Sequence, residues 1–202
     1  VSLVAPDGTT VLLVGGVGGD TDDFTSTCLN GNATDNIAQA YPPYTGTFGR
    51  AELKHLLKRT LFGATNADLT FFEGASLGAV VDALLDCTND TTPPVKTYWG
   101  LNGNTRDPSL VDAEVLWGTT WINTVNDPSQ ADDAQGERVA SFVTWRTGLM
   151  VYQDRTLREK LTLFWFNHMP VEASAVFSGE MLYAYDQILR DNCTGNFRQM
   201  IY

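Results

Sequence analysis

The chain has 202 residues, enough for one large domain or for one domain with an appendage, and enough to bury a core without disulfides or metals. Its 24 acidic and 13 basic residues give a net charge of −11. Because such a charge repels phosphate backbones, nucleic acid is not expected to be a partner. No apolar run approaches the roughly 20 residues of a membrane-spanning helix, so no transmembrane segment is expected.

The cysteines indicate a disulfide but not its pairing. Three are present, at Cys28, Cys87 and Cys193. They lack the Cys-x-x-Cys spacing of zinc knuckles, redox pairs and haem attachment sites. An odd number allows one disulfide, with the third cysteine free or joined to another chain, and all three pairings stay open.

Three triplets have the pattern of glycosylation acceptors, and they begin at Asn32, Asn89 and Asn192. Together with the acidity, the low lysine content and the abundance of Thr, Asn and Gly, they predict an extracellular or secreted glycoprotein at the cell surface. The first residue is Val1 and no signal-like segment follows, which predicts a processed or truncated N-terminus.

Residues 1–49 differ in kind from the rest and are predicted to be an extended β and loop segment. Residues 1–5 and 9–14 are apolar and flank Pro6-Asp7-Gly8, a turn sequence, so they predict a β-hairpin. A lone two-stranded hairpin is marginally stable in water. We therefore expect its strands to pair with a partner chain, a neighbouring domain or the helical part.

Helical periodicity begins at Arg50. Residues 51–62 carry leucines at helical spacing and end before Gly63. Thr65 and Asp68 resemble a capping box that opens a short helix to about Glu73, and Ser76 is predicted to cap a helix over residues 77–86.

The middle of the chain is predicted as a long loop over residues 87–108, a helix from Pro108 to about Val125, an acidic connector over 126–133 and a helix over 135–152. The loop contains Tyr98 and Trp99. Trp99 there is either a lid packed on the helical part or a platform for a ligand.

The densest apolar and aromatic stretch is Thr156–Met169. On a helix its side chains are apolar nearly all round, with only a narrow polar strip, which predicts a buried central helix. Pro170 is a natural stop. Residues 171–178 are predicted as a loop, 179–192 as a helix and 195–202 as the start of a last helix. The predicted fold is mainly α: a multi-helix orthogonal bundle over residues 50–202, truncated at its C-terminal end, with a short N-terminal β-hairpin.

Three segments resemble one known family. They are residues 53–65, the run from Leu157 to His168 that reads LREKLTLFWFNH, and the run from Leu189 to Arg198 that reads LRDNCTGNFR. In this order they are similar to motifs of the family called domain of unknown function 1800. The resemblance implies a mainly helical, often exported protein. Phe166 stands where the family often has His, so a His-x-His metal pair, if relatives use one, has lost a ligand here.

The candidate catalytic residues are His168, Glu159 and Arg158. His168 is predicted at the C-terminal end of the buried helix, as a metal ligand or general base with Glu172 or Glu180 nearby, or as a core histidine that binds nothing. Arg158 and Glu159 are either a catalytic pair or an internal salt bridge that involves neighbouring helices, with Arg190 or Arg198 receiving carboxylates.

Three functions follow as hypotheses. The preferred one is an exported structural or interaction protein of the surface or of an assembly, with a protein partner or self-association. The alternatives are a metal-assisted hydrolase centred on His168 and a carbohydrate-binding surface protein that uses Tyr98 or Trp99. The sequence names no cofactor, and whether the chain is an enzyme stays open.

Overall fold

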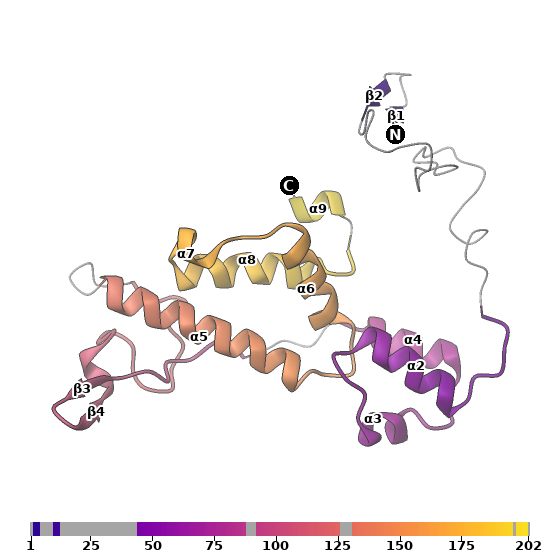
Figure 1. The fold of residues 1–202 in the computed structure, drawn as a ribbon, viewed down its shortest axis with the longest axis horizontal. Coiled ribbons are helices and arrows are strands. Elements are labelled where there is room, and N and C mark those ends of the chain that lie inside the picture. The colour runs from indigo at the N-terminus through magenta and orange to yellow at the C-terminus, as the bar shows by residue number, and fades with distance from the viewer. Residues whose placement is uncertain are drawn as a thin grey trace, which may run out of the picture. The chain divides into compact units, whose positions relative to one another are not determined.

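The computed structural model describes residues 2–4, 10–12, 44–87, 92–125, 131–195 and 197–201 (Figure 1). The chain divides into two compact units, Val1–Thr47 and Phe48–Tyr202. In the first unit, β1 (Ser2–Val4) pairs antiparallel with β2 (Thr10–Leu12). The predicted strands are thereby confirmed, whereas their turn lies outside the described residues.

The second unit begins with three helices, α2 (Arg50–Thr60), α3 (Asn66–Phe71) and α4 (Leu77–Leu85), as the sequence predicts. Both predicted caps are confirmed. The hydroxyl of Thr65 accepts a hydrogen bond from the Asp68 amide at 3.2 Å, and that of Ser76 accepts one from the Ala79 amide at 3.3 Å. An apolar core joins the three helices, and its buried members are Leu53, Leu57, Leu61, Leu69, Phe72, Val80 and Leu84.

The helix predicted from Pro108 to Val125 is wrong. A β-hairpin of β3 (Gly100–Asn102) and β4 (Thr105–Asp107) comes first, and a single 3₁₀ turn, η1 (Pro108–Leu110), follows it. Residues 111–125, all of them described, contain no further helix. The predicted loop over 87–108 is therefore partly a hairpin, whose turn contains Gly103 at a φ of 60°.

Lys96 is the physical reason why the segment after η1 does not form a helix. Its buried ammonium donates hydrogen bonds to the backbone carbonyl oxygens of Val111, Asp112 and Val115, at 2.7, 2.7 and 3.0 Å. An α-helix needs these carbonyls for its own ladder. Asp112 also has a φ of 52°, in the left-handed region, which a right-handed helix excludes.

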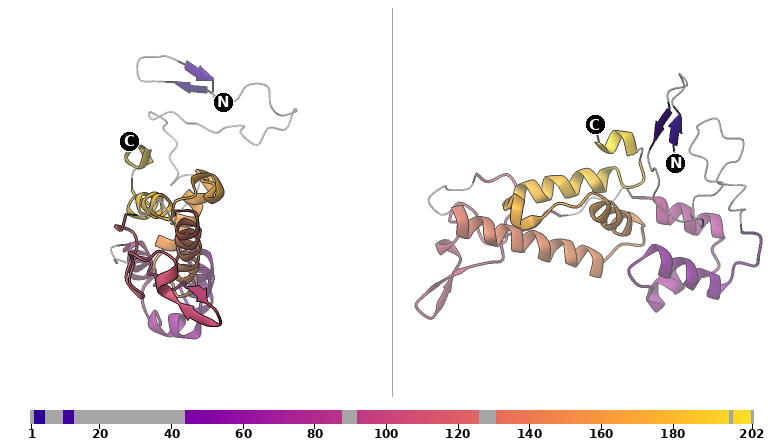
Figure 2. Two further views of the ribbon diagram at one scale, coloured as in Figure 1. Left: turned by 90° about the vertical axis from the view of Figure 1, so that its left-hand side faces the viewer. Right: turned by 45° about the horizontal axis from the view of Figure 1, so that its top comes forward.

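The remaining helices are α5 (Ala131–Val151), α6 (Arg158–His168), α7 (Ala173–Val176), α8 (Gly179–Asp191) and α9 (Phe197–Ile201). They confirm a mainly helical fold, although α7 occupies a predicted loop. Helices α5 and α8 lie side by side (Figures 1 and 2). Gly179 permits this approach, because a Cβ there would lie 2.7 Å from the Cβ of Arg138.

A second apolar core lies between α5, α8 and the segment from Val95 to Ile122. Its buried members are Tyr98, Val115, Trp121, Phe142 and Leu182. Among the described residues, no helix combines the length and the apolar character that crossing a bilayer requires.

The aromatic stretch is less buried in α6 than predicted. Its buried side chains are Arg158, Glu159 and Thr162, whereas Phe164 is 54% exposed and His168 is exposed. A helix that is apolar nearly all round does not itself show which of its faces the neighbouring helices cover. The two charged side chains are buried because α8 supplies them with partners of opposite charge.

Candidate functional site

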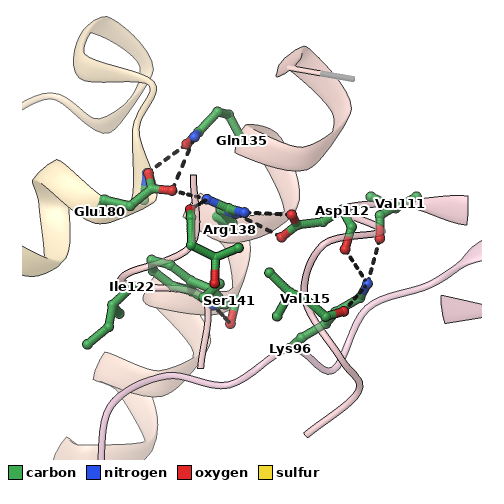
Figure 3. Close-up of polar contacts among 12 residues, drawn as sticks. Lys96, Val111, Asp112, Val115, Ile122, Gln135, Arg138, Ser141 and Glu180 are labelled. Atoms are coloured by element: carbon green, nitrogen blue, oxygen red, sulfur yellow. Dashed lines mark hydrogen bonds and ion pairs between the residues drawn. The ribbon is translucent and has the colours of Figure 1, made fainter. Parts of the chain in front are cut away.

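A buried ion pair joins α5 to the irregular segment after η1 (Figure 3). Arg138, on α5, donates from Nε to Oδ2 of Asp112 at 2.8 Å and from Nη2 to Oδ1 at 2.5 Å. Its Nη1 donates to the Thr124 carbonyl oxygen at 2.9 Å and to Glu180 on α8. The Arg138 side chain has no exposed surface. Such a bidentate pair fixes both partners in one geometry.

Oδ2 of Asp112 also accepts a hydrogen bond from the hydroxyl of Tyr98, at 2.5 Å. Burial alone would raise the pKa of Asp112, but the hydrogen bonds from Arg138 and Tyr98 outweigh it, so the pKa lies below its usual value. Burial lowers the pKa of Lys96, and the negative charge of Asp112 opposes that shift. We call Lys96, Tyr98, Asp112, Arg138 and Glu180 the Arg138 network.

A cavity of about 370 Å³ lies beside this network. Its wall contains an indole ring, a carboxylate and several hydroxyls, from Thr97, Tyr98, Trp99, Glu137, Ala140, Ser141 and Thr144. The ring of Trp99 is half-buried, with the guanidinium of Arg106 at 4.3 Å from its centroid. Tyr98 is buried and its hydroxyl is bound by Asp112, so the structure does not offer it as a platform.

A second buried group of charges lies where α5, α6 and α8 meet. Arg190 donates to Oε2 of Glu159 at 2.6 Å, and Arg146 pairs with Asp186. Arg158 contacts the exposed Asp191 at 3.3 Å. We call Arg146, Arg158, Glu159, Asp186 and Arg190 the α5–α6–α8 cluster. Of the two interpretations of Arg158 and Glu159, these contacts favour internal salt bridges.

The α5–α6–α8 cluster is incompletely hydrogen-bonded. Among the described residues, Oδ2 of Asp186, Nη2 of Arg146, and Nε and Nη2 of Arg190 have no hydrogen-bond partner. Burial raises the pKa of Asp186 to about 6, although Arg146 and Arg190 oppose the shift. Asp186 can therefore take up or release a proton near neutral pH, a property that the sequence did not predict.

One sequence signal could have located these arginines. Arg138, Phe142, Trp145 and Arg146 recur at the spacing i, i+4, i+7 and i+8, which is one face of a helix. Phe142 and Trp145 mark this face as the core-facing one. An arginine on such a face needs a buried carboxylate partner, whose identity the spacing does not give.

The prediction that His168 lies at the end of a buried helix is wrong. It is exposed at the C-terminus of α6, where its ring stacks on Phe164, with centroids 5.9 Å apart, and meets the edge of Trp165. The two carboxylates named as its neighbours are engaged elsewhere, since Glu172 accepts from Ser174 and Glu180 accepts from Arg138. Within the described residues, no group of three or more His, Cys, Asp or Glu side chains could hold a metal ion.

The rings around His168 form an exposed group. Phe164 meets Trp165 edge-on at 5.0 Å, and Trp165 stacks on Phe197 of α9 at 5.3 Å. Phe197 is 45% exposed. We call Phe164, Trp165, His168 and Phe197 the aromatic surface.

The predicted modification sites are only partly described. Cys28, Asn32 and Asn89 lie outside the described residues. Asn192 is half-buried after α8, and its side-chain amide donates to the Ile188 carbonyl oxygen at 2.9 Å. Cys87 and Cys193 are both thiols here, and the two side chains interact with each other.

Comparison with curated proteins and with solved structures finds no match. The model of one family, described as "Protein of unknown function (DUF1800)", matches residues 55–202. The match covers the helices from α3 to α9, together with most of α2, and includes both charge networks and the aromatic surface. The chain therefore belongs to the DUF1800 family.

Proposed function

We propose that this chain is an exported structural or interaction protein, which associates with a second copy of itself through the aromatic surface, and that residues 50–202 pack as an orthogonal helical bundle. The observation that carries the proposal is the exposure of aromatic rings on α6, a helix that buries two charged side chains. Arg158 and Glu159 are buried against α8, whereas Phe164 and His168 are exposed and Trp165 is half-buried. Aromatic side chains in mutual contact at the protein surface are typical anchors of protein interfaces.

The charge of the chain supports a second copy as the occupant. A net charge of −11 makes most contacts between two copies repulsive. The aromatic surface contains no carboxylate, since its members are Phe164, Trp165, His168 and Phe197. In a two-fold dimer each copy presents the same patch to the other, so a patch without acidic side chains lets two acidic chains meet with the least repulsion.

Sedimentation velocity over a wide range of protein concentrations tests this proposal. We expect the full chain to form dimers, and to form them more readily at high salt, because salt screens the repulsion between acidic surfaces. Phe164→Ser combined with Phe197→Ser should leave a monomer of unchanged helicity.

The control is Leu116→Ser, which removes an apolar side chain that is also exposed but lies outside the aromatic surface. This variant should dimerise like the original chain. A chain that stays monomeric at every concentration and salt level, with its disulfides and glycans intact, would contradict the proposal.

A second candidate function, sugar binding, is favoured by the cavity beside Trp99. An indole ring stacks on the apolar face of a sugar, and Thr97, Glu137 and Thr144 offer hydroxyls and a carboxylate for its hydroxyl groups. A glycan array tests it: a ligand that binds the full chain and is lost in Trp99→Ala would support this function. Leu101→Ala, an exposed position on β3 outside the cavity wall, is the control. An array without any bound glycan would exclude the candidate.

A further inference from the structure

Two cysteines that are distant in the chain meet in the fold. Cys87 follows α4 and Cys193 follows α8, about a hundred residues later. The two thiols interact with each other, and both interact with the guanidinium of Arg158. Cys193 is buried and Cys87 is half-buried. The two side chains therefore lie close to each other, Cys193 below the surface and Cys87 partly exposed.

Contacts with α6 hold the ends of α4 and α8 in this place. The amide of Leu157 donates to the Leu84 carbonyl oxygen at 2.7 Å, three residues before Cys87. On the other side, the indole N–H of Trp165 donates to the carbonyl oxygen of Cys193 itself, at 3.2 Å.

In a third contact, Arg158 forms an ion pair at 3.3 Å with Asp191, which lies two residues before Cys193. The start of α6 thus contacts the end of α4 close to Cys87 and the end of α8 close to Cys193. The meeting of the two thiols follows from the positions of three helices, and does not depend on one flexible side chain.

We propose that Cys87 and Cys193 form the intramolecular disulfide of this protein and that Cys28 is the cysteine left outside it. The oxidant is another disulfide, either that of a protein thiol oxidase or oxidised glutathione. A thiolate of the pair attacks a sulfur of the donor disulfide, a mixed disulfide forms and one donor thiol leaves. The second thiolate then attacks the mixed disulfide and releases the other donor thiol. The cysteine pair loses two electrons and two protons, and the donor gains them.

The surroundings of the thiols decide when this exchange takes place. Burial raises the pKa of both thiols, that of Cys87 to about 11, which leaves roughly one thiolate in ten thousand at neutral pH. Exchange in the folded, reduced protein is therefore slow. The bond forms while the chain folds, before the burial of the pair is complete, and the same burial afterwards shields it from small reductants.

Refolding the full chain in a glutathione redox buffer, and in parallel with excess dithiothreitol, tests the proposal. Peptide mass spectrometry without reduction should find a fragment pair joined through Cys87 and Cys193 and lighter by two hydrogen atoms, with Cys28 alkylated. The thermal midpoint of the oxidised form should be higher by on the order of 10 °C, because the bond closes a loop of about a hundred residues.

In the reduced form, iodoacetamide should react with these two thiols at least a hundredfold more slowly before denaturation than after it. Cys28→Ser should keep the cross-link, whereas Cys87→Ser and Cys193→Ser should each abolish it. A cross-link that includes Cys28 would overturn the proposal, and so would full alkylation of Cys87 and Cys193 in the denatured oxidised sample. Both outcomes are read from the unsubstituted chain, so a variant that fails to fold does not obscure them.

Discussion

Single residues with buried charge set the interior geometry of this protein. Arg138 and Asp112 are both almost without exposed surface, and each satisfies the other through two hydrogen bonds. A buried pair of this kind adds little stability relative to apolar side chains, but removing one partner leaves the other as an uncompensated charge. The Arg138 network therefore specifies where the segment after η1 lies against α5.

Arg138→Met should lower the free energy of unfolding by about 3–5 kcal/mol, because Asp112 would stay buried without its cation. Urea denaturation measures the loss. The matched control is Arg50→Met, which breaks the exposed pair of Arg50 with Glu73 at 3.3 Å and should cost less than about 1 kcal/mol. Equal losses in the two variants would contradict the role given to the Arg138 network.

Asp186 should make stability depend on pH. Its folded-state pKa of about 6 lies above the ordinary value of 3.8, so the folded protein binds this proton more tightly than the unfolded chain does. The resulting stabilisation is full below the ordinary pKa and is lost as the pH rises through 6. Relative to Asp186→Asn, which does not titrate, the original chain should lose about 3 kcal/mol of stability between about pH 3 and pH 7.

Urea midpoints of both proteins across this pH range measure the difference. Asp107 provides a control of opposite sign, since hydrogen bonds from Ser109 lower its pKa and the stability that it contributes is lost as the pH falls. A difference between the original chain and Asp186→Asn that does not change with pH would show that Asp186 stays ionised.

At the scale of elements, the close approach of α5 and α8 depends on one glycine. A Cβ at Gly179 would lie 2.7 Å from the Cβ of Arg138 and 3.0 Å from its carbonyl carbon, and the carbonyl carbon belongs to the backbone and cannot turn away. The packing of the two helices therefore excludes any side chain at position 179.

Gly179→Ala should lower the free energy of unfolding by about 1–3 kcal/mol, because α8 must move away from α5 to make room for the methyl group. Gly148→Ala on α5 is the control. Nothing lies within 4 Å of a Cβ there, so alanine should stabilise the helix by roughly 0.5–1 kcal/mol. Thermal unfolding followed by circular dichroism compares the two, and stabilisation by both substitutions would refute the packing argument.

The elements that could be predicted are those whose signals are local. The leucine spacing of α2 and the caps at Thr65 and Ser76 depend on residues within one or two turns, and the structure confirms them. Residues 108–125 were mistaken for a helix because Lys96, more than a dozen residues earlier, takes their carbonyl oxygens.

The charged sites were only partly predictable for the same reason. Salt bridges for Arg158 and Glu159, with Arg190 as a partner for carboxylates, could be inferred from buried charge on a helix, and the contact of Arg190 with Glu159 agrees with that inference. The pairing of Arg138 with Asp112 could not, because Asp112 reaches it only through an irregular backbone that periodicity does not describe.

At the scale of the whole molecule, burial makes the surface more acidic than the composition indicates. Among the described residues, the buried charged side chains are more often cations, Lys96, Arg138, Arg146, Arg158 and Arg190, than carboxylates, Asp112, Glu159 and Asp186. The excess of negative charge therefore lies at the surface, where it repels itself and where salt can screen it.

Raising the NaCl concentration from a few millimolar to physiological strength and beyond should increase the thermal midpoint by a few degrees, because salt weakens repulsion across the surface of a chain whose net charge is −11. The buried ion pairs are shielded from salt and should not offset this gain. Differential scanning calorimetry at low protein concentration, where association is minimal, measures it. A midpoint that falls with salt would mean that exposed ion pairs outweigh the repulsion.

The way in which Lys96 binds its segment determines which sequence changes the fold can accept. Its ammonium contacts main-chain oxygens, and these are present whatever side chains occupy positions 111, 112 and 115. Substitutions there leave these three acceptors in place, although one at Asp112 also removes the partner of Arg138, whereas a substitution of Lys96 removes all three bonds at once. The conformation of this segment is thus encoded at a distant position. Since Lys96 leaves the ribosome first, its ammonium is already available when the segment that it binds is synthesised.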